Sequence, residues 1–197
     1  MRPKIFNLGL SRTGTMWLDT VFNESGLKSA HFLGVEPDKA LHRIEALDCA
    51  GDTPIPSMAA RLKALYPDAK FVLTTRPKEQ WLSSMEWMLK HGAVIWSYGK
   101  AVDAYHQDFY GTAKFDRRIL SDFYDRYHAE TQELFRDEPE RLLIIDITDK
   151  DVEAIAAFCD LDVEQLKVQQ KPVNARRKAG LKARVKWTLK RVLNRIP

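Results

Sequence analysis

The chain has 197 residues, of which 45% are hydrophobic and 29% are charged, a composition typical of one globular domain. No apolar run approaches the ~20 residues that a helix needs to cross a bilayer, and no apolar leader segment precedes the first expected strand. We therefore expect a cytoplasmic protein. Its two cysteines, Cys49 and Cys159, fit no metal-ligand spacing, and we expect both to be reduced and buried.

The charge is unevenly distributed along the chain. The net charge is +4, but eleven Lys and Arg residues and no Asp or Glu follow Glu164, so the preceding part is net acidic. Within this basic tail, apolar residues recur every three or four positions, at Leu181, Val185, Leu189, Val192 and Ile196. We therefore expect residues 1–173 to form one domain and residues 174–197 a basic amphipathic helix, which either docks on that domain or lies on an anionic membrane. A solvated charged face is the simpler alternative.

Strand and helix patterns alternate along the chain. In chain order, the expected elements are a strand at residues 4–8, a helix at 16–24, a helix that begins at Pro37, a short helix after Ser57, a strand at 70–75, a helix at 77–89, a helix at about 119–135, a strand at 141–147 and a helix at 151–158. Aromatic residues between positions 92 and 111 have no clean period, so no element is assigned there; core or lid packing is the simpler interpretation and acceptor binding the alternative. Continuous apolar strands between helices predict a three-layer α/β fold of the P-loop type, with helices flanking a central parallel sheet.

The segment between the first strand and the first helix has the spacing of a phosphate-binding loop. Gly9 and Gly14 reproduce the G-x-x-x-x-G pattern, whose backbone N–H groups can hold an anion at a helix N-terminus. A loop that hydrolyses nucleotides continues with Lys and then Ser or Thr, whereas this chain has Thr15 and Met16 there. Arg12 is the only cation in the loop. These residues predict a phosphate-like ligand that is handled without a metal ion.

A second pair of residues points to another phosphate. Arg76 follows the expected strand at 70–75, at the sheet edge where open α/β folds bind their ligands. Ser84 lies eight residues further on, in the next expected helix. A guanidinium at a strand end and a hydroxyl from the following helix can hold one phosphate from two sides.

Together these motifs resemble those of sulfotransferases that use 3′-phosphoadenosine 5′-phosphosulfate (PAPS), especially the small bacterial-type members. The resemblance covers residues 4 to about 158 and includes the phrase Tyr66–Pro77 that leads into the second motif. It implies that Arg76 and Ser84 bind the 3′-phosphate. It also implies that the first loop binds the 5′-phosphosulfate through Arg12, Thr13, Gly14, Thr15, the backbone of Met16, and Trp17.

The same resemblance suggests how the reaction would proceed. A sulfuryl group carries less negative charge than a terminal phosphoryl group, so a cation at the bridging oxygen can stabilise the departing phosphate without Mg²⁺. Arg12 would supply that cation.

The catalytic base is less clearly marked. Asp52-Thr53-Pro54 matches the position of a His-x-Pro base in the cytosolic members, although Asp52 could equally cap the following turn. Ala50 stands where those members have a Lys that contacts the sulfuryl group.

Three further residues are weighed as acid–base candidates and left out: His31, His91 and Glu86. A lone histidine is more often a packing or surface residue than a catalytic one.

The resemblance thus implies a metal-independent sulfotransferase that moves a sulfuryl group from PAPS to a hydroxyl or amine of a small-molecule, glycan or lipid acceptor. We expect a cytoplasmic protein, peripheral to the membrane if the tail binds one, and we do not expect a nucleic-acid partner. Two alternatives remain open. A small P-loop kinase would need the loop Lys and the metal-binding hydroxyl that are replaced here. A nucleotide-binding or membrane-associated adaptor would keep the pocket and lack the base.

Overall fold

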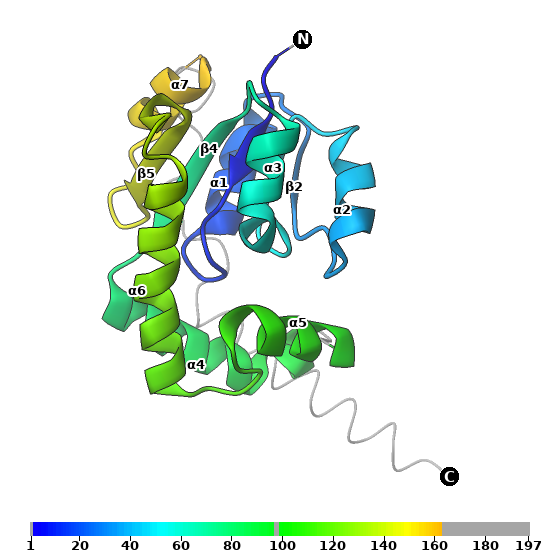
Figure 1. Cartoon of the computed structure of the whole chain (residues 1–197), viewed down its shortest axis with the longest axis vertical. Coiled ribbons are helices and arrows are strands. Elements are labelled where there is room, and N and C mark those ends of the chain that lie inside the picture. The colour runs from blue at the N-terminus through cyan, green and yellow to red at the C-terminus, as the bar shows by residue number, and fades with distance from the viewer. Residues whose placement is uncertain (1, 97–98, 163–197) are drawn as a thin grey trace.

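The computed structural model of the protein describes residues 2–96 and 99–162, and it has a five-stranded sheet at its centre (Figure 1). All neighbouring strands are parallel, in the order β2-β3-β1-β4-β5. In chain order the elements are β1 (Ile5–Asn7), α1 (Thr15–Glu24), β2 (Ser29–His31), α2 (Pro37–Ile44), β3 (Cys49–Gly51), α3 (Ala59–Leu65), β4 (Lys70–Thr75), α4 (Lys78–Ile95), α5 (Lys100–Tyr110), α6 (Arg117–Leu134), β5 (Leu142–Asp146) and α7 (Val152–Cys159).

Helices cover both faces of the sheet, and successive strand residues, which point to opposite sides, pack against different helical layers. In β4, Phe71 and Leu73 pack into one hydrophobic cluster with α2, α3 and α6, whereas Val72 packs into a second cluster with α1 and α7. Strands that are apolar on both faces are what a sheet between two helical layers requires. The predicted three-layer α/β fold with a central parallel sheet is therefore confirmed.

Two strands escaped the sequence analysis. β2 and β3 have the sequences Ser-Ala-His and Cys-Ala-Gly, which lack the apolar run that marks the equally short β1, and the residues of β2 are only half-buried. Their pairing in the sheet is a tertiary property: β3 hydrogen-bonds with β1, and β2 with β3. The structure also assigns elements in the described part of the segment at 92–111: α4 continues to Ile95, and α5 carries Tyr105, Phe109 and Tyr110.

α4 and α5 lie across the carboxyl ends of the strands (Figure 1). Aromatic side chains from this layer and from α6 hold the backbone where strands end. Trp81 Nε1 donates to Ser11 O at 3.0 Å, Tyr127 Oη to Leu8 O at 2.7 Å, and Tyr124 Oη to the carbonyl of the residue after β4 at 2.6 Å. These hydrogen bonds satisfy carbonyls that the sheet leaves unpaired, and they fix the loop edge of the sheet.

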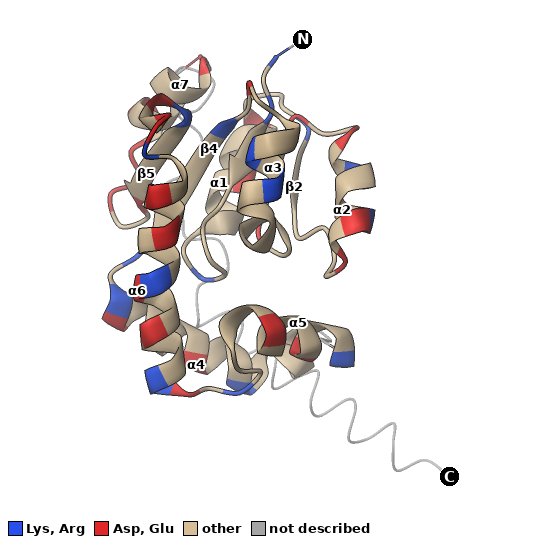
Figure 2. Ribbon diagram, in the orientation of Figure 1, with Lys and Arg blue, Asp and Glu red and all other residues tan. Residues whose placement is uncertain are grey.

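Charged residues of both signs are mixed along the outer helices, as α6 shows (Figure 2). Cys49 and Cys159 are buried free thiols, as predicted. Among residues 2–96 and 99–162, no helix is long and apolar enough to cross a membrane, and no group of three His, Cys, Asp or Glu is placed to hold a metal ion. The expected basic helix at 174–197 lies outside the described residues.

Candidate active site

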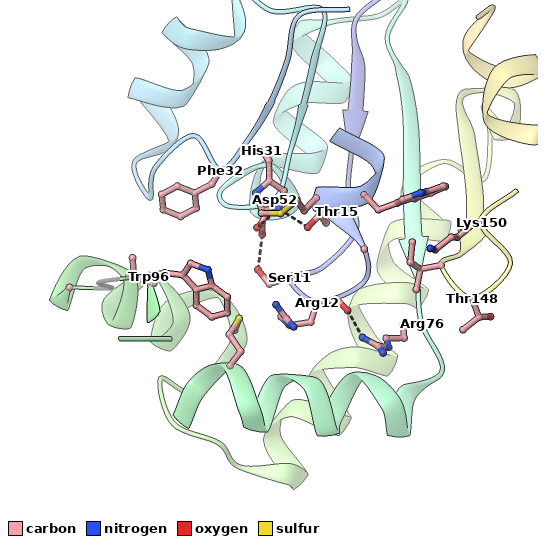
Figure 3. Close-up of a pocket in the computed structure, with 17 residues that line it drawn as sticks. Ser11, Arg12, Thr15, His31, Phe32, Asp52, Arg76, Trp96, Thr148 and Lys150 are labelled. Carbon is pink, nitrogen blue, oxygen red and sulfur yellow. Dashed lines mark hydrogen bonds and ion pairs between the residues drawn. The ribbon is translucent and has the colours of Figure 1, made fainter. Parts of the chain in front are cut away.

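A cavity of about 620 Å³ opens at the carboxyl ends of the strands, beside the loop between β1 and α1. Its two ends differ in chemistry (Figure 3). One end is lined by cationic and polar groups, namely Arg76, Thr148 and Lys150. The other end is lined by the aromatic side chains of Phe32 and Trp96 (Figure 3), and the apolar Met88 and Val102 also line the cavity. Arg12 lies between them, next to Ser11 and Asp52 (Figure 3). The cavity can therefore accept an anionic group at one end and an apolar group at the other.

The two glycines of the loop are both required by its shape. A Cβ on Gly9 would lie 1.8 Å from Thr74 Oγ1, so the backbone passes too close to β4 for any side chain. Gly14 has φ +92°, and a Cβ there would lie 2.2 Å from the side chain of Ile147. Gly14 is also the N-cap of α1, and no side chain among the described residues caps this helix. The helix N-terminus thus faces the cavity in the way that anion sites use.

The other predicted loop residues divide between packing and lining. Thr13 is fully buried and bonds to Leu10 O and Thr74 Oγ1, so its side chain holds the loop. Thr15, Met16 and Trp17 line the cavity, and Trp17 also packs in the cluster beneath α1.

Arg12 is held in one orientation from several directions. Its backbone adopts φ +77°, and its carbonyl accepts a hydrogen bond from Arg76 Nη1 at 3.3 Å. Its side chain donates from Nε to Ser84 Oγ at 3.0 Å. The guanidinium carbon lies 5.7 Å from the ring centroid of Trp87 and 5.8 Å from that of Trp96, distances at which a cation is attracted to an aromatic face. A preformed cation therefore stands in the middle of the cavity.

The predicted pair Arg76 and Ser84 is only partly brought together. Arg76 lines the cationic end of the cavity. Ser84 is 1% exposed, and its hydroxyl accepts the hydrogen bond from Arg12 instead of lining the cavity. Lys150, which the sequence analysis did not single out, is the second cation at the same end as Arg76 (Figure 3).

Asp52 directly follows β3 and lines the cavity, where its carboxylate contacts the side chain of His31 at the end of β2. His31 Nε2 lies 3.0 Å from Asp52 Oδ2, and Ser11 Oγ donates to Asp52 Oδ1 at 2.7 Å. The same His31 nitrogen lies 2.9 Å from Thr15 Oγ1. Only 19% of the His31 side chain and 13% of the Asp52 side chain are exposed, so the pair is largely shielded from water. This placement gives Asp52 a partner network beyond that of a turn cap.

His31 and Asp52 shift each other's pKa. Burial by itself would lower the pKa of His31, but the hydrogen bond to Asp52 and its negative charge reverse this, and the pKa of His31 is raised above 6.5. Burial by itself would raise the pKa of Asp52, but His31 and the Ser11 hydroxyl lower it below 3.8. Asp52 is therefore a carboxylate near neutral pH, with acceptor capacity on both oxygens.

Strained backbone is concentrated around the cavity. Five described residues other than glycine have positive φ, and four of them line it: Arg12, Phe32, Asp52 and Lys150. Such conformations cost of order 1–3 kcal/mol each and persist where the surrounding structure imposes them. Local sequence preference does not explain them, and their clustering supports the cavity as the candidate functional site.

Two of the residues at the site were not predicted. The sequence analysis named His31 and left it out, because a single histidine carries no spacing signal. His31 is matched to Gly51 by the pairing of β2 with β3, and that register brings it next to the residue after β3. Lys150 follows β5 in a loop without a motif. Only the topology of the sheet places these two residues at the cavity.

Comparisons with known proteins agree with this fold. A model of the sulfotransferase domain matches residues 35–174, more than half of the chain. A protein of Aspergillus versicolor described as Ava biosynthesis cluster protein M is 32% identical over 42% of this chain and 42% of its own length. The chain therefore spans less than half of this curated relative.

Two solved structures were also found to be similar. A sulfotransferase from Alicyclobacillus acidocaldarius aligns over 87% of each chain with a TM-score of 0.53 and 12% identity, a likeness of fold. Mouse sulfotransferase SULT7A1 complexed with PAP aligns over 93% of this chain and 63% of its own, with a TM-score of 0.43 and 15% identity. The family match covers Asp52 and Arg76, which line the cavity, and Ser84 on α4. The chain belongs to the sulfotransferase family.

Proposed function

We propose that the protein transfers a sulfuryl group from PAPS to the hydroxyl of an apolar acceptor, without a metal ion. One observation carries this proposal: Arg12 and Asp52 face the same cavity, between its cationic and its apolar end. The 3′-phosphate of the nucleotide would lie at the cationic end, near Arg76 and Lys150. The 5′-phosphosulfate would lie at the N-terminus of α1, beside Arg12, and the acceptor would enter from the apolar end.

The chemistry follows from the two side chains between the ends. Asp52 accepts the proton of the acceptor hydroxyl as its oxygen attacks sulfur. The bond between sulfur and the bridging oxygen breaks, and the electron pair stays on the departing 5′-phosphate. Arg12 stabilises the charge that develops there, where a fixed cation is most effective. The products are the sulfate ester and adenosine 3′,5′-bisphosphate.

The nature of the acceptor follows from the same geometry. Phe32, Trp96 and Val102 offer apolar contacts and few hydrogen-bonding groups, which suits an apolar ring better than a sugar. The lowered pKa of Asp52 makes it a weak base, so it works best on hydroxyls that are already acidic. Both observations favour a phenolic hydroxyl over an aliphatic or carbohydrate one.

Calorimetry tests the nucleotide part of the proposal. Adenosine 3′,5′-bisphosphate should bind far more tightly than AMP or ATP, because only the first places a phosphate between Arg76 and Lys150. A charge-assisted hydrogen bond contributes about 1.5–3 kcal/mol, and about 1.4 kcal/mol corresponds to a factor of ten. Arg76→Ala should therefore weaken bisphosphate binding roughly tenfold or more. Equal affinity for AMP and the bisphosphate would contradict the assignment.

Turnover tests the acceptor part. Purified protein with PAPS, in the presence of EDTA, should sulfate simple phenols faster than monosaccharides or aliphatic alcohols of similar size. Turnover of ATP with Mg²⁺ would instead favour the kinase alternative. Tight binding of the bisphosphate with no turnover on a broad acceptor panel would favour the adaptor alternative.

A further inference from the structure

The cavity contains one titratable group to which the proposed reaction assigns no step, the imidazole of His31. It lies at the end of β2, and a single ring nitrogen faces two groups that the proposal does use. Nε2 is 3.0 Å from Asp52 Oδ2 and 2.9 Å from Thr15 Oγ1. Asp52 is the proposed base, and Thr15 is the first residue of the helix whose N-terminus would receive the 5′-phosphate.

The hydrogen on this nitrogen follows from the contacts. The Asp52 carboxylate offers only acceptors, so a 3.0 Å contact with Nε2 is a hydrogen bond only if Nε2 carries hydrogen. A protonated Nε2 has no lone pair in the ring plane to offer, so the Thr15 hydroxyl cannot donate to it. The single Nε2–H is then shared between Asp52 Oδ2 and Thr15 Oγ1, both of which accept, and the hydrogen of the Thr15 hydroxyl is directed elsewhere. Both the neutral Nε2–H tautomer and the imidazolium form meet this requirement.

We propose that His31 is a positioning residue that fixes two groups at once: it directs the Asp52 carboxylate toward the acceptor, and it leaves the Thr15 hydroxyl hydrogen to be donated to the nucleotide. This inference rests on the proposed function. It assigns His31 no contact with either substrate. His31 acts through Asp52 and Thr15, and so connects the base to the nucleotide-binding helix.

Other charged and titratable groups surround the pair and enter its pH dependence. Asp19 on α1 and Arg12 in the loop act on His31 with opposite signs. On the side of α5, the buried groups Tyr105, His106 and Tyr110 lie within electrostatic reach of Asp52. Burial lowers the pKa of His106, so its neutral form is favoured. The charge of Asp52 acts to raise the pKa of both histidines, but only at His31, which Asp52 contacts directly, do the opposing interactions outweigh burial.

Substitution of His31 separates positioning from packing. His31→Leu removes the donor, and His31→Gln keeps an amide N–H near the place of Nε2. We expect kcat to fall roughly ten- to hundredfold in His31→Leu, the effect of losing one charge-assisted hydrogen bond, and to recover largely in His31→Gln. His42→Leu is the matched control, because His42 on α2 is exposed and lies away from the cavity. Equal losses in the Leu and Gln variants would overturn the inference.

Two further readouts would not respond to a purely structural role. Without His31, burial dominates the pKa of Asp52, so the acid limb of the kcat–pH profile should move to higher pH in His31→Leu. His31→Leu should also cause little further loss of kcat in an Asp52→Asn background. The contact of His31 with Thr15 is tested by nucleotide binding. Thr15→Val should weaken bisphosphate binding more when it is made in the wild-type protein than when it is made in His31→Leu. An unmoved acid limb, or fully additive losses, would contradict the proposal.

NMR titration of the histidine rings requires no turnover, so it tests the role of His31 independently of the proposed sulfotransferase activity. The His31 ring should titrate above 6.5 in the wild-type protein and below that in Asp52→Asn, where burial and Arg12 act on it and the main opposing group is gone. A His31 ring that titrates identically in both would overturn the inference even in an active sulfotransferase. If the wild-type protein sulfates no acceptor while this titration behaves as expected, the proposed function fails and the His31–Asp52 assignment stands.

Discussion

At the scale of single residues, the site depends on backbone positions that few side chains tolerate and on one cation that cannot move. Arg12 has a positive φ, a carbonyl bonded to Arg76, an Nε bonded to Ser84 and two indole rings beside its guanidinium. A group fixed in this way needs little reorganisation when charge develops next to it. Fixed charge is more effective in a transition state than mobile charge of the same size.

Arg12→Ala should therefore affect the chemical step more than binding. We expect kcat to fall by a factor of about 10² to 10³, the loss typical of removing one group that stabilises developing charge, while the affinity for PAPS changes much less. Single-turnover kinetics and calorimetry measure the two quantities separately. Normal kcat with only a raised KM for PAPS would show that Arg12 is a binding residue.

The base makes a prediction of a different kind. Asp52→Asn should lower kcat while nucleotide affinity is kept, because Asn occupies nearly the same volume and cannot accept the proton as a carboxylate does. The loss should shrink along a series of phenols of decreasing pKa, since more acidic hydroxyls need less help from a base. A constant loss across that series would argue that Asp52 has a structural role.

Gly14 makes a prediction about stability. Gly14→Ala introduces both a left-handed alanine and a clash with Ile147, whereas Gly26→Ala has the same backbone cost, at φ +82°, with nothing within 4 Å of the new Cβ. The backbone cost alone is about 1–2 kcal/mol. Denaturant unfolding should therefore show that Gly14→Ala loses clearly more stability than Gly26→Ala, and that only the former loses bisphosphate binding. Similar losses in both would mean that Ile147 moves aside without cost.

At the scale of elements, α4 is the helix that supports the loop between β1 and α1. Trp81 bonds to the carbonyl of Ser11, Ser84 accepts from Arg12, and Trp87 flanks its guanidinium. These three residues follow one another at spacings of three, which places them on one side of the helix. Because α4 begins just after β4, the Arg76 position and the loop are tied to the same rigid unit.

This arrangement predicts that Ser84 orients Arg12 and does not bind the 3′-phosphate. Ser84→Ala should lower kcat in the same direction as Arg12→Ala but less, and should cause no further loss once Arg12 is alanine. The ratio of the affinities for the bisphosphate and AMP should stay as in the wild-type protein. Ser83→Ala, at the exposed neighbouring residue, is the control. Loss of that discrimination in Ser84→Ala would instead place the hydroxyl on the 3′-phosphate.

At the scale of the whole molecule, the His31–Asp52 pair links stability to pH. The raised pKa of His31 contributes stability that is fully present below 6.5 and is lost as pH rises through the raised value. The lowered pKa of Asp52 contributes stability that is present above 3.8 and is lost as pH falls through the lowered value. The pair therefore stabilises the fold most between these two ordinary values.

Comparison of wild type with Asp52→Asn measures the contribution of the Asp52 interactions, of which the contact with His31 is the direct one, because groups that do not interact with Asp52 cancel in the difference. The free energy of unfolding should differ most between about pH 4 and 6.5, the ordinary values of the two groups, and the difference should narrow on either side. A difference that does not depend on pH would show that the two groups are not paired in solution.

The basic tail gives a further whole-molecule prediction that rests on sequence alone. Its cations and apolar stripe should bind vesicles that contain anionic lipid, and added salt should weaken that binding by screening. Deleting residues 181–197 should abolish vesicle binding and leave bisphosphate binding intact. If the truncated protein unfolds instead, the apolar stripe packs against the domain.

The sequence by itself determined the three-layer fold, the long elements and the first loop, because these depend on local patterns. Apolar runs identify β1 and β4, and the spacing of Gly9 and Gly14 identifies a turn that only glycine permits. The same local signals placed Arg12 and Arg76 at the carboxyl edge of a parallel sheet, and the cavity lies there. Asp52 was named from the family resemblance, and β3, the strand that precedes it, was not predicted.

Only the tertiary structure decided what surrounds those residues. β2 and β3 contain no apolar run by which a strand could be recognised, and their pairing brings His31 to Asp52 across twenty-one positions of the chain. The turn of α4 directs Ser84 to Arg12, and the loop after β5 brings Lys150 to Arg76. Such neighbours are set by strand register and helix packing, which depend on the whole core. A sequence read locally can name the reacting groups, whereas the groups that orient them are fixed by contacts between distant segments.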